Sequence, residues 1–167
     1  HRRQRQMCIR DRCNIKNIKK YKSSILNIIK KQGPIDILVN NASNDQRHSL
    51  ENITEKYWDD RMAINLKHYL FAIQSVKKSM IKNKGGSIIN LGSVSWVRGA
   101  VMFPAYSIAK AGIHGLTRSL ARDLGKHNII TSYYEQNQAA ALAGEKQVID
   151  LIYSQAPDWS QQKVRTF

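Results

Sequence analysis

The chain contains few cysteines, few acidic residues and no long apolar run, and each shortage argues against a class of protein. Its two cysteines, Cys8 and Cys13, have no partner pair and no histidine cluster beside them, which argues against a disulfide framework and a zinc site. The five histidines show no ligand spacing, so we expect no bound metal. No stretch approaches the roughly 18 consecutive apolar residues of a membrane span, and no apolar block follows the basic N-terminus as in a secretory signal. We therefore expect a cytoplasmic protein.

The shortage of acidic residues is mostly local. The formal net charge is +15, from 27 Lys and Arg against 12 Asp and Glu, and a net +10 of it falls within residues 1–31. A basic arm that binds nucleic acid is one interpretation of this segment. Residues 1–12, HRRQRQMCIRDR, have no apolar period, which favours the other interpretation, a non-native or disordered leader. We expect neither a membrane nor a nucleic acid as a partner.

Helical and strand patterns alternate through the middle of the chain. Apolar residues recur at three- and four-residue steps over 17–32, 54–80 and 104–125, which predicts three amphipathic helices. Short apolar runs, IDILVNNAS at 35–43 and SIINLGS at 87–93, predict two buried strands between them. This alternation is typical of a parallel sheet covered by helices on both faces. The predicted fold is therefore α/β, with a doubly wound parallel sheet.

The pattern weakens beyond His127. IITSYY at 129–134 could form a strand and residues 139–153 a helix, whereas the last fifteen residues have an irregular pattern. The length of 167 residues and the 42% hydrophobic content are typical of one globular domain. We predict a leader at 1–12, a partial α/β domain at 13–130 and a divergent segment at 131–167.

Two residues of the third predicted helix have a spacing with chemical meaning. Tyr106 and Lys110 are four residues apart, so they lie on one face of a helix, where an ammonium favours ionisation of a phenol. With 7 Tyr and 16 Lys in the chain, about 0.7 such pairs are expected by chance. The pair alone therefore indicates little. Ser93 ends the preceding strand thirteen residues earlier, and requiring it lowers the chance expectation to about 0.06.

Other polar residues fall near the same edge of the predicted sheet. Residues 40–43, NNAS, end the first strand, and their small and amide side chains would let a flat cofactor approach the backbone. Ligands of open α/β sheets bind at the carboxyl ends of the strands. Asn65 lies beside Leu66 of the apolar helix stripe, where a buried amide needs hydrogen-bond partners.

Residues 13–130 resemble the short-chain dehydrogenase/reductases in the motifs DILVNNAS, NL at 65–66, GGSIINLGSVS and AYSIAKAGIHGLTRSLARDLG. The resemblance implies a Rossmann-like fold and an oxidoreductase that uses NAD or NADP. It implies that Tyr106 exchanges a proton with the substrate oxygen, and that Lys110 lowers the pKa of Tyr106 and holds the nicotinamide ribose. Ser93 would bond the substrate oxygen, and Asn65 would anchor a water in a proton relay.

The resemblance also implies which residues contact the cofactor. The NNA motif would brace the sheet and flank the cofactor, with Ser43 standing where the family usually has Gly. Residues 14–15 match the end of the family's third strand, where Asp often lies against adenine. The implied cofactor contacts are Asn14, Ile15, Asn40, Asn41, Ala42, Ser43, Tyr106 and Lys110.

The loops after the two strands are similar to the branch of the family that oxidises sugars, such as the xylose and galactose 1-dehydrogenases. This similarity implies a small-molecule alcohol or aldose as substrate, with Ser93, Asn44, Trp96 and Val97 around it. Two alternatives stay open: Trp96 is equally well explained as packing, and Asn44 as a turn residue. Family members commonly form dimers or tetramers through two long helices, so we expect a homo-oligomer.

The chain also departs from the family. It has no first strand followed by a Gly-rich turn for a pyrophosphate, and after DLGKHNI it lacks the usual Pro-Gly turn. We therefore expect a Rossmann-like sheet that is truncated at its N-terminal side and aberrant at its C-terminal side, with weak cofactor binding. The strand IDILVNN would present an open edge. A catalytically inactive fragment, or an interaction module with a basic arm that binds nucleic acid, is the alternative function.

Overall fold

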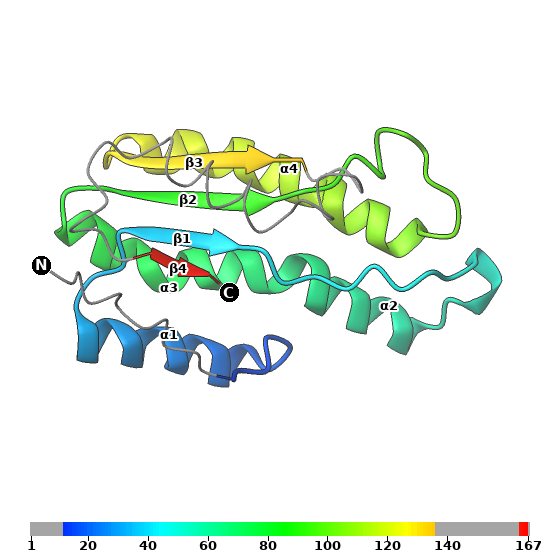
Figure 1. Cartoon of the computed structure of the whole chain (residues 1–167), viewed down its shortest axis with the longest axis horizontal. Coiled ribbons are helices and arrows are strands. Elements are labelled where there is room, and N and C mark those ends of the chain that lie inside the picture. Colours follow the sequence, from blue (N-terminus) through cyan, green and yellow to red (C-terminus); the bar gives the residue numbers. More distant parts are fainter. Residues whose placement is uncertain (1–11, 136–163, 167) are drawn as a thin grey trace, which may run out of the picture.

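The computed structural model of the protein describes residues 12–135 and the backbone of 164–166. Helices and strands alternate along the chain, as the sequence predicts (Figure 1). The elements, in chain order, are α1 (Ile18–Gln32), β1 (Ile37–Asn40), the 3₁₀ turn η1 (Leu50–Asn52), α2 (Glu55–Met62), the π turn η2 (Ala63–Lys67), α3 (His68–Lys82), β2 (Gly86–Leu91), α4 (Pro104–Gly125), β3 (Ile129–Tyr134) and β4 (Val164–Thr166).

The strands form one parallel sheet in the order β3-β2-β1-β4. Val39 of β1 is level with Ile89 of β2, and Ile89 is level with Ser132 of β3. Helices connect β1 to β2 and β2 to β3, and such crossover connections let consecutive strands run in the same direction. The α/β fold class is confirmed, and residues 129–134, for which a strand was possible, form β3. Residues 139–153, for which a helix was possible, lie outside the described residues.

The edge of β1 is not open, which corrects one expectation. Residues 164–166 pair with β1 in parallel, with Val39 level with Thr166. A strand with unpaired N–H and C=O groups is a template for another extended segment, and the β-branched Val164 and Thr166 favour extended backbone. The prediction of an irregular end was therefore wrong at these three residues.

The apolar core lies between the sheet and the helices. Strand side chains alternate between the two faces of a sheet, and on one face Leu38 and Ile88 pack against α1, α3 and the end of α4. This apolar core consists of Tyr21, Ile25, Ile35, Leu38, Ala72, Ile73, Val76, Met80, Ile88, Leu124 and Ile129. On the other face Ile37, Val39, Ile89 and Leu91 form a second cluster with Tyr134. No helix from residues 12–135 contributes to that second cluster. The sequence predicts helices on both faces of the sheet, and the described residues have them on one face.

The segment predicted as a single helix from Thr54 is interrupted. Thr54 caps it as expected, since its Oγ1 accepts a hydrogen bond from the Tyr57 N–H at 3.1 Å. After the eight residues of α2, the backbone widens into η2, which carries Asn65. Gly112 of α4 lies against this turn, because a Cβ there would stand 3.0 Å from the Leu66 side chain. The π turn and α4 are therefore in close contact beside the carboxyl ends of the strands.

Candidate active site

Tyr106 and Lys110 lie in the first turns of α4, a helix that begins beyond the carboxyl end of β2 (Figure 1). Their four-residue spacing brings them together as predicted, with Lys110 Nζ 5.5 Å from the centre of the Tyr106 ring. Lys110 is only 1% exposed. Its ammonium donates a hydrogen bond to the Leu91 carbonyl at 3.0 Å, and the Tyr69 hydroxyl donates to the same oxygen at 3.0 Å. The last residue of β2 therefore holds the lysine under the tyrosine.

Two serine side chains, those of Ser93 and Ser43, interact with the Tyr106 hydroxyl. Burial raises the pKa of Tyr106 above its ordinary value of 10.0, and hydrogen bonds with the Ser93 and Ser43 side chains partly oppose that rise. The net direction is opposite to the lowering by Lys110 that the family resemblance implies. The reason is that burial disfavours phenolate, and the negative charge of Asp45 adds to the rise.

Asp45 is a member of the site that the sequence analysis missed. Burial lowers the pKa of Lys110 from 10.5 to about 8, and the negative charge of Asp45 opposes that fall. The same carboxylate contributes to the raised pKa of Tyr106. The charge of Asp45, in the loop after β1, therefore acts on both residues. Its position one residue after the predicted substrate residue Asn44 was the available signal.

The loop that carries Asp45 is held by Asn65. The Asn65 side chain accepts a hydrogen bond from the Asn44 N–H at 2.7 Å and donates one to the Asn44 carbonyl at 3.1 Å. This meets the requirement of a buried amide for partners. Arg61 donates to the Asn44 side-chain oxygen at 2.7 Å, and the Gln46 N–H donates to it at 3.0 Å. Asn44 thus shapes the loop in this structure, and its contact with substrate stays a prediction, as does a water held by Asn65.

The NNAS motif divides into a buried and an exposed part. Asn40 is fully buried and donates to the Asn90 side chain at 2.8 Å, and Asn90 donates to Thr117 at 3.0 Å. These bonds join β1, β2 and α4, which is the predicted bracing of the sheet. Asn41 and Ser43 are exposed and Ala42 is half-buried. Contact of these residues with a cofactor stays a prediction.

The predicted substrate residues Trp96 and Val97 lie in the loop after β2. Val97 is exposed, whereas Trp96 is half-buried and donates from Nε1 to the Tyr133 hydroxyl at 3.3 Å. The Tyr133 ring lies directly against Gly92, where a Cβ would collide with it, and the Ser93 backbone is bonded to its hydroxyl. Sequence patterns gave no signal for Tyr133, because its contacts are with residues about forty positions earlier in the chain.

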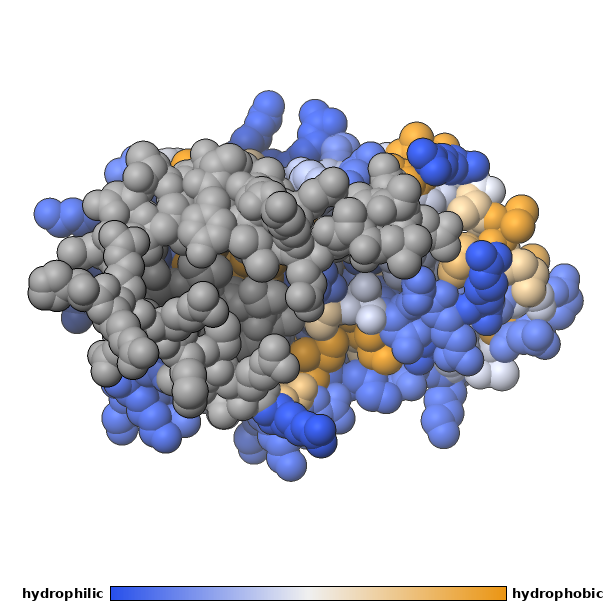
Figure 2. All heavy atoms as spheres, viewed as in Figure 1, coloured by the Kyte–Doolittle hydropathy of each residue, from blue (hydrophilic) through white to orange (hydrophobic). Residues whose placement is uncertain are grey.

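Exposed apolar side chains gather at the same end of the molecule, where Figure 2 shows hydrophobic residues near the loop after β2. They include Leu50, Val97, Val101 and Met102. Three of them, with Trp96 and His48, line a cavity of about 490 Å³ beside the N-terminal end of α4. An apolar wall therefore borders the polar site.

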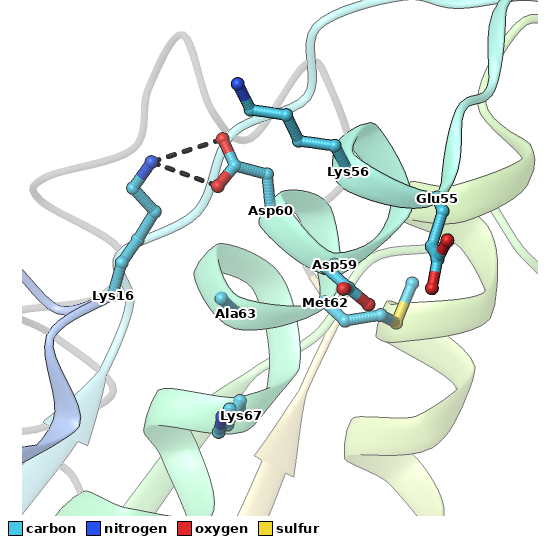
Figure 3. Close-up of a pocket in the computed structure, with 8 residues that line it drawn as sticks. All are labelled: Lys16, Glu55, Lys56, Asp59, Asp60, Met62, Ala63 and Lys67. Carbon is cyan, nitrogen blue, oxygen red and sulfur yellow. Dashed lines mark hydrogen bonds and ion pairs between the residues drawn. The ribbon is translucent and has the colours of Figure 1, made fainter.

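Asn14 and Ile15 are separated from this cluster in the described contacts. Asn14 is exposed and accepts a hydrogen bond from the Lys16 N–H at 3.0 Å, and Ile15 packs against the apolar core. Lys16 forms an ion pair with Asp60 of α2 at 3.1 Å, on the rim of a cavity of about 670 Å³ (Figure 3). The lining of that cavity includes none of the predicted catalytic residues. Adenine contact by residues 14–15 stays a prediction.

A parallel sheet with a Tyr–Lys pair and a serine at its carboxyl edge defines a class of protein. The chain belongs to the short chain dehydrogenase family, whose model matches residues 2–135. That match begins inside the predicted leader, residues 1–12, whose nature stays a prediction. In the part of the chain that the structure describes, no helix is long and apolar enough to cross a membrane.

Two relatives are named for the oxidation of sugars. A D-xylose 1-dehydrogenase of Caulobacter vibrioides is 47% identical over 118 residues, which are 71% of this chain and 46% of that protein. A protein named probable galactose dehydrogenase, from Rhizobium meliloti, is 41% identical over 116 residues, or 70% of this chain and 45% of that protein. The chain spans about half the length of these relatives.

Solved structures have the same fold. A metagenomic short-chain oxidoreductase in complex with NADP has a TM-score of 0.80 at 24% identity, over 94% of this chain and 71% of that one. The apo form of LigO from Sphingobium sp. strain SYK-6 has a TM-score of 0.74 at 27% identity, over 89% and 56%.

Proposed function

We propose that the protein transfers hydride between a nicotinamide cofactor, NAD or NADP, and an alcohol or carbonyl carbon. The observation that carries this proposal is the arrangement of Tyr106, Lys110 and Ser93 at the carboxyl edge of the sheet, in a chain of the short chain dehydrogenase family. The two named sugar dehydrogenases and the fold shared with an NADP complex support it.

The chain's own residues would handle the proton. The Tyr106 hydroxyl would exchange a proton with the substrate oxygen, and Ser93 would donate a hydrogen bond to that oxygen, since it already bonds the Tyr106 hydroxyl. Both side chains fix the oxygen at one point. Lys110 would keep a positive charge beneath the phenol and favour its ionised form.

The residues present fit a nicotinamide cofactor on the β1 side of the site. Asn41 and Ser43 are exposed there, and with the Lys110 ammonium they offer hydrogen-bond donors that the hydroxyl groups of a ribose can accept. A nicotinamide cofactor supplies the hydride chemistry when it is bound. On the β2 side Tyr133 covers Gly92, so we expect the cofactor to approach the site from the β1 side.

The substrate we propose is an aldose, oxidised at its anomeric carbon. Asp45 supports this class, because its carboxylate acts electrostatically on Tyr106 and Lys110 and can accept hydrogen bonds from hydroxyl groups of a sugar. Trp96 and Val97 would supply apolar surface for the carbon face of the ring. As a homo-oligomer, the protein would use the outer faces of α3 and α4, where Leu70 and Ile108 are exposed.

The test measures reduction of NAD and of NADP, with a panel of aldoses and simple secondary alcohols, by the complete family domain that contains this chain. Turnover of an aldose that falls by about 100- to 10,000-fold in Tyr106→Phe is the expected result. Tyr134→Phe, at the end of β3, is the matched control and should retain activity. Turnover of secondary alcohols alone would overturn the assignment of an aldose as the substrate. A folded protein that binds nicotinamide and turns over no substrate would overturn the proposed hydride transfer.

A further inference from the structure

The helix that carries Tyr106 begins without a cap of its own. Its first residue, Pro104, has no N–H, and the preceding Phe103 makes no side-chain capping bond. The first N–H of α4 is therefore that of Ala105, and the N–H groups of a first turn have no partner inside the helix. The Ala105 N–H donates to Nε2 of His48 at 3.1 Å. A residue 57 positions earlier thus caps this helix.

The contacts of His48 determine which ring nitrogen carries its proton. Nδ1 lies 2.9 Å from the Gln46 carbonyl, and a carbonyl oxygen only accepts, so Nδ1 must carry a hydrogen. Nε2 accepts from Ala105, so it carries none. His48 is therefore neutral in this arrangement. It is 6% exposed, and its ring packs 5.0 Å from that of Tyr57.

His48 binds both sides of the turn before α4. Its backbone N–H donates to the Met102 carbonyl at 2.9 Å, and Met102 has a φ of 63°, a left-handed conformation that a residue with a side chain rarely adopts. The side chain then bonds Ala105 on the far side of Pro104. The turn is held at two points, one of them the residue immediately before Tyr106.

The same loop leads back to Asn65. Gln46, which orients the His48 ring, donates from its backbone to Asn44, and Asn44 is bonded on both backbone groups by Asn65. Each step of this series is a hydrogen bond with a distance of 2.7 to 3.1 Å. It runs from the π turn to the first N–H of α4.

We propose that His48 is a positioning residue, which caps α4 through the Ala105 N–H and thereby fixes the Tyr106 hydroxyl relative to Ser93 and Lys110. The importance of Tyr106 rests on the proposed function, whereas the cap itself does not. An ordinary packing role for the His48 ring is the competing explanation. The two differ because packing needs only the ring, and capping needs an acceptor at Nε2.

Two substitutions separate these explanations. His48→Phe keeps an aromatic ring at this position but removes both hydrogen-bonding nitrogens. In His48→Gln the ring is lost, but the side-chain amide can still accept from Ala105 and donate to Gln46. His127→Phe, at the opposite end of α4, is the matched control. On this chain, ¹⁵N NMR reports which side-chain nitrogen of His48 carries the proton, and hydrogen exchange reports the protection of the Ala105 amide. In the complete domain, kcat and KM are measured.

We expect the native His48 to carry its proton on Nδ1. Exchange of the Ala105 amide should accelerate about tenfold in His48→Phe, since a net hydrogen bond is lost, and stay within about threefold of native in His48→Gln and His127→Phe. In the complete domain kcat should fall about tenfold in His48→Phe with little change in KM, and His48→Gln should recover most of it.

Several results would overturn the proposal. A proton on Nε2 of native His48 removes the acceptor, and equal Ala105 exchange in the native chain and His48→Phe shows that no cap exists. A lost cap with unchanged kcat, in a domain that Tyr106→Phe inactivates, refutes the positioning of Tyr106. If Tyr106→Phe itself leaves turnover unchanged, the proposed function fails, while the NMR results still decide the cap. If His48→Phe does not fold, two other measurements decide whether the cap exists. They are the tautomer of His48 in the native chain and the exchange of the Ala105 amide in His48→Gln.

Discussion

The apolar core and the carboxyl edge of the sheet are equally buried but are built from opposite kinds of side chain. The core beneath the strands is aliphatic and aromatic. At the edge, Asn40, Asn65, His68, Asn90 and Lys110 are 0 to 1% exposed and are held by hydrogen bonds. The same helix serves both, since α4 contributes Leu124 to the core and Lys110 to the edge. Burial therefore stabilises the fold in one region and creates chemistry at a cost in stability in the other.

The largest effect should come from a truncation in the core. Ile88 of β2 is fully buried beneath the sheet, so Ile88→Ala removes apolar contacts and leaves a cavity, which costs about 2–5 kcal/mol of unfolding free energy. Urea denaturation followed by circular dichroism measures it. Ile130→Ala is the matched control, because Ile130 on β3 is 62% exposed and should change stability by less than about 0.5 kcal/mol. Equal losses at the two positions would contradict the distinction between core and surface.

A second prediction concerns His68, which lies where the core meets the edge. Its Nε2 donates to the Ala42 carbonyl at 3.0 Å, and its ring contacts those of Tyr21 and Tyr69. Burial lowers the pKa of His68 from 6.5 to about 4, and the bond to Ala42 partly opposes this. The unfolded chain therefore takes up the proton first as the pH falls. The stability contributed by neutral His68 is complete above pH 6.5 and is lost between pH 6.5 and 4.

The loss between these pH values should amount to about 3 kcal/mol, from the difference between the two pKa values. Unfolding free energies of the native chain and of His68→Gln, measured by urea denaturation at several pH values, check it. The glutamine keeps a donor for Ala42 and removes the titration, so its curve should be flatter. The same substitution at His127 serves as the control. Parallel curves for the native chain and His68→Gln would show that His68 is not the source of the pH dependence.

The local features of both regions could be predicted from the sequence. The three- and four-residue apolar steps gave the helices, because periodicity is a property of neighbouring residues. Thr54 and Pro104 marked two helix starts correctly. The spacing of Tyr106, Lys110 and Ser93 located the site, since a helix face and a strand end convert sequence distance into proximity.

The features that depend on distant parts of the chain could not be predicted. The π turn at Asn65 breaks a helix whose apolar steps continue through it. The pairing of β4 with β1, the ring of Tyr133 over Gly92 and the cap from His48 each join residues far apart in sequence. Burial also reversed the expected direction of the Tyr106 pKa, because the environment of a phenol depends on the packed structure and not on a spacing.

The third prediction is the smallest in free energy and separates the two roles of α4. Burial holds the pKa of Lys110 at about 8, below its ordinary 10.5. The unfolded chain therefore binds the proton first as the pH falls from 10.5 to 8, and below that range the buried ammonium lowers stability. Lys110→Met keeps the stem and removes the charge. The Leu91 carbonyl still accepts from Tyr69, so at pH 7 we expect a gain of about 1–2 kcal/mol in unfolding free energy, together with loss of turnover in the complete domain. The gain should shrink above pH 10.5, where the lysine of the native chain is neutral in both the folded and the unfolded state.

Lys126→Met, at the exposed end of α4, is the control and should leave stability and turnover unchanged. A less stable Lys110→Met would show that the buried ammonium stabilises the carboxyl edge. The carboxyl edge and the apolar core would then differ in the kind of side chain that is buried, but not in the effect of burial on stability.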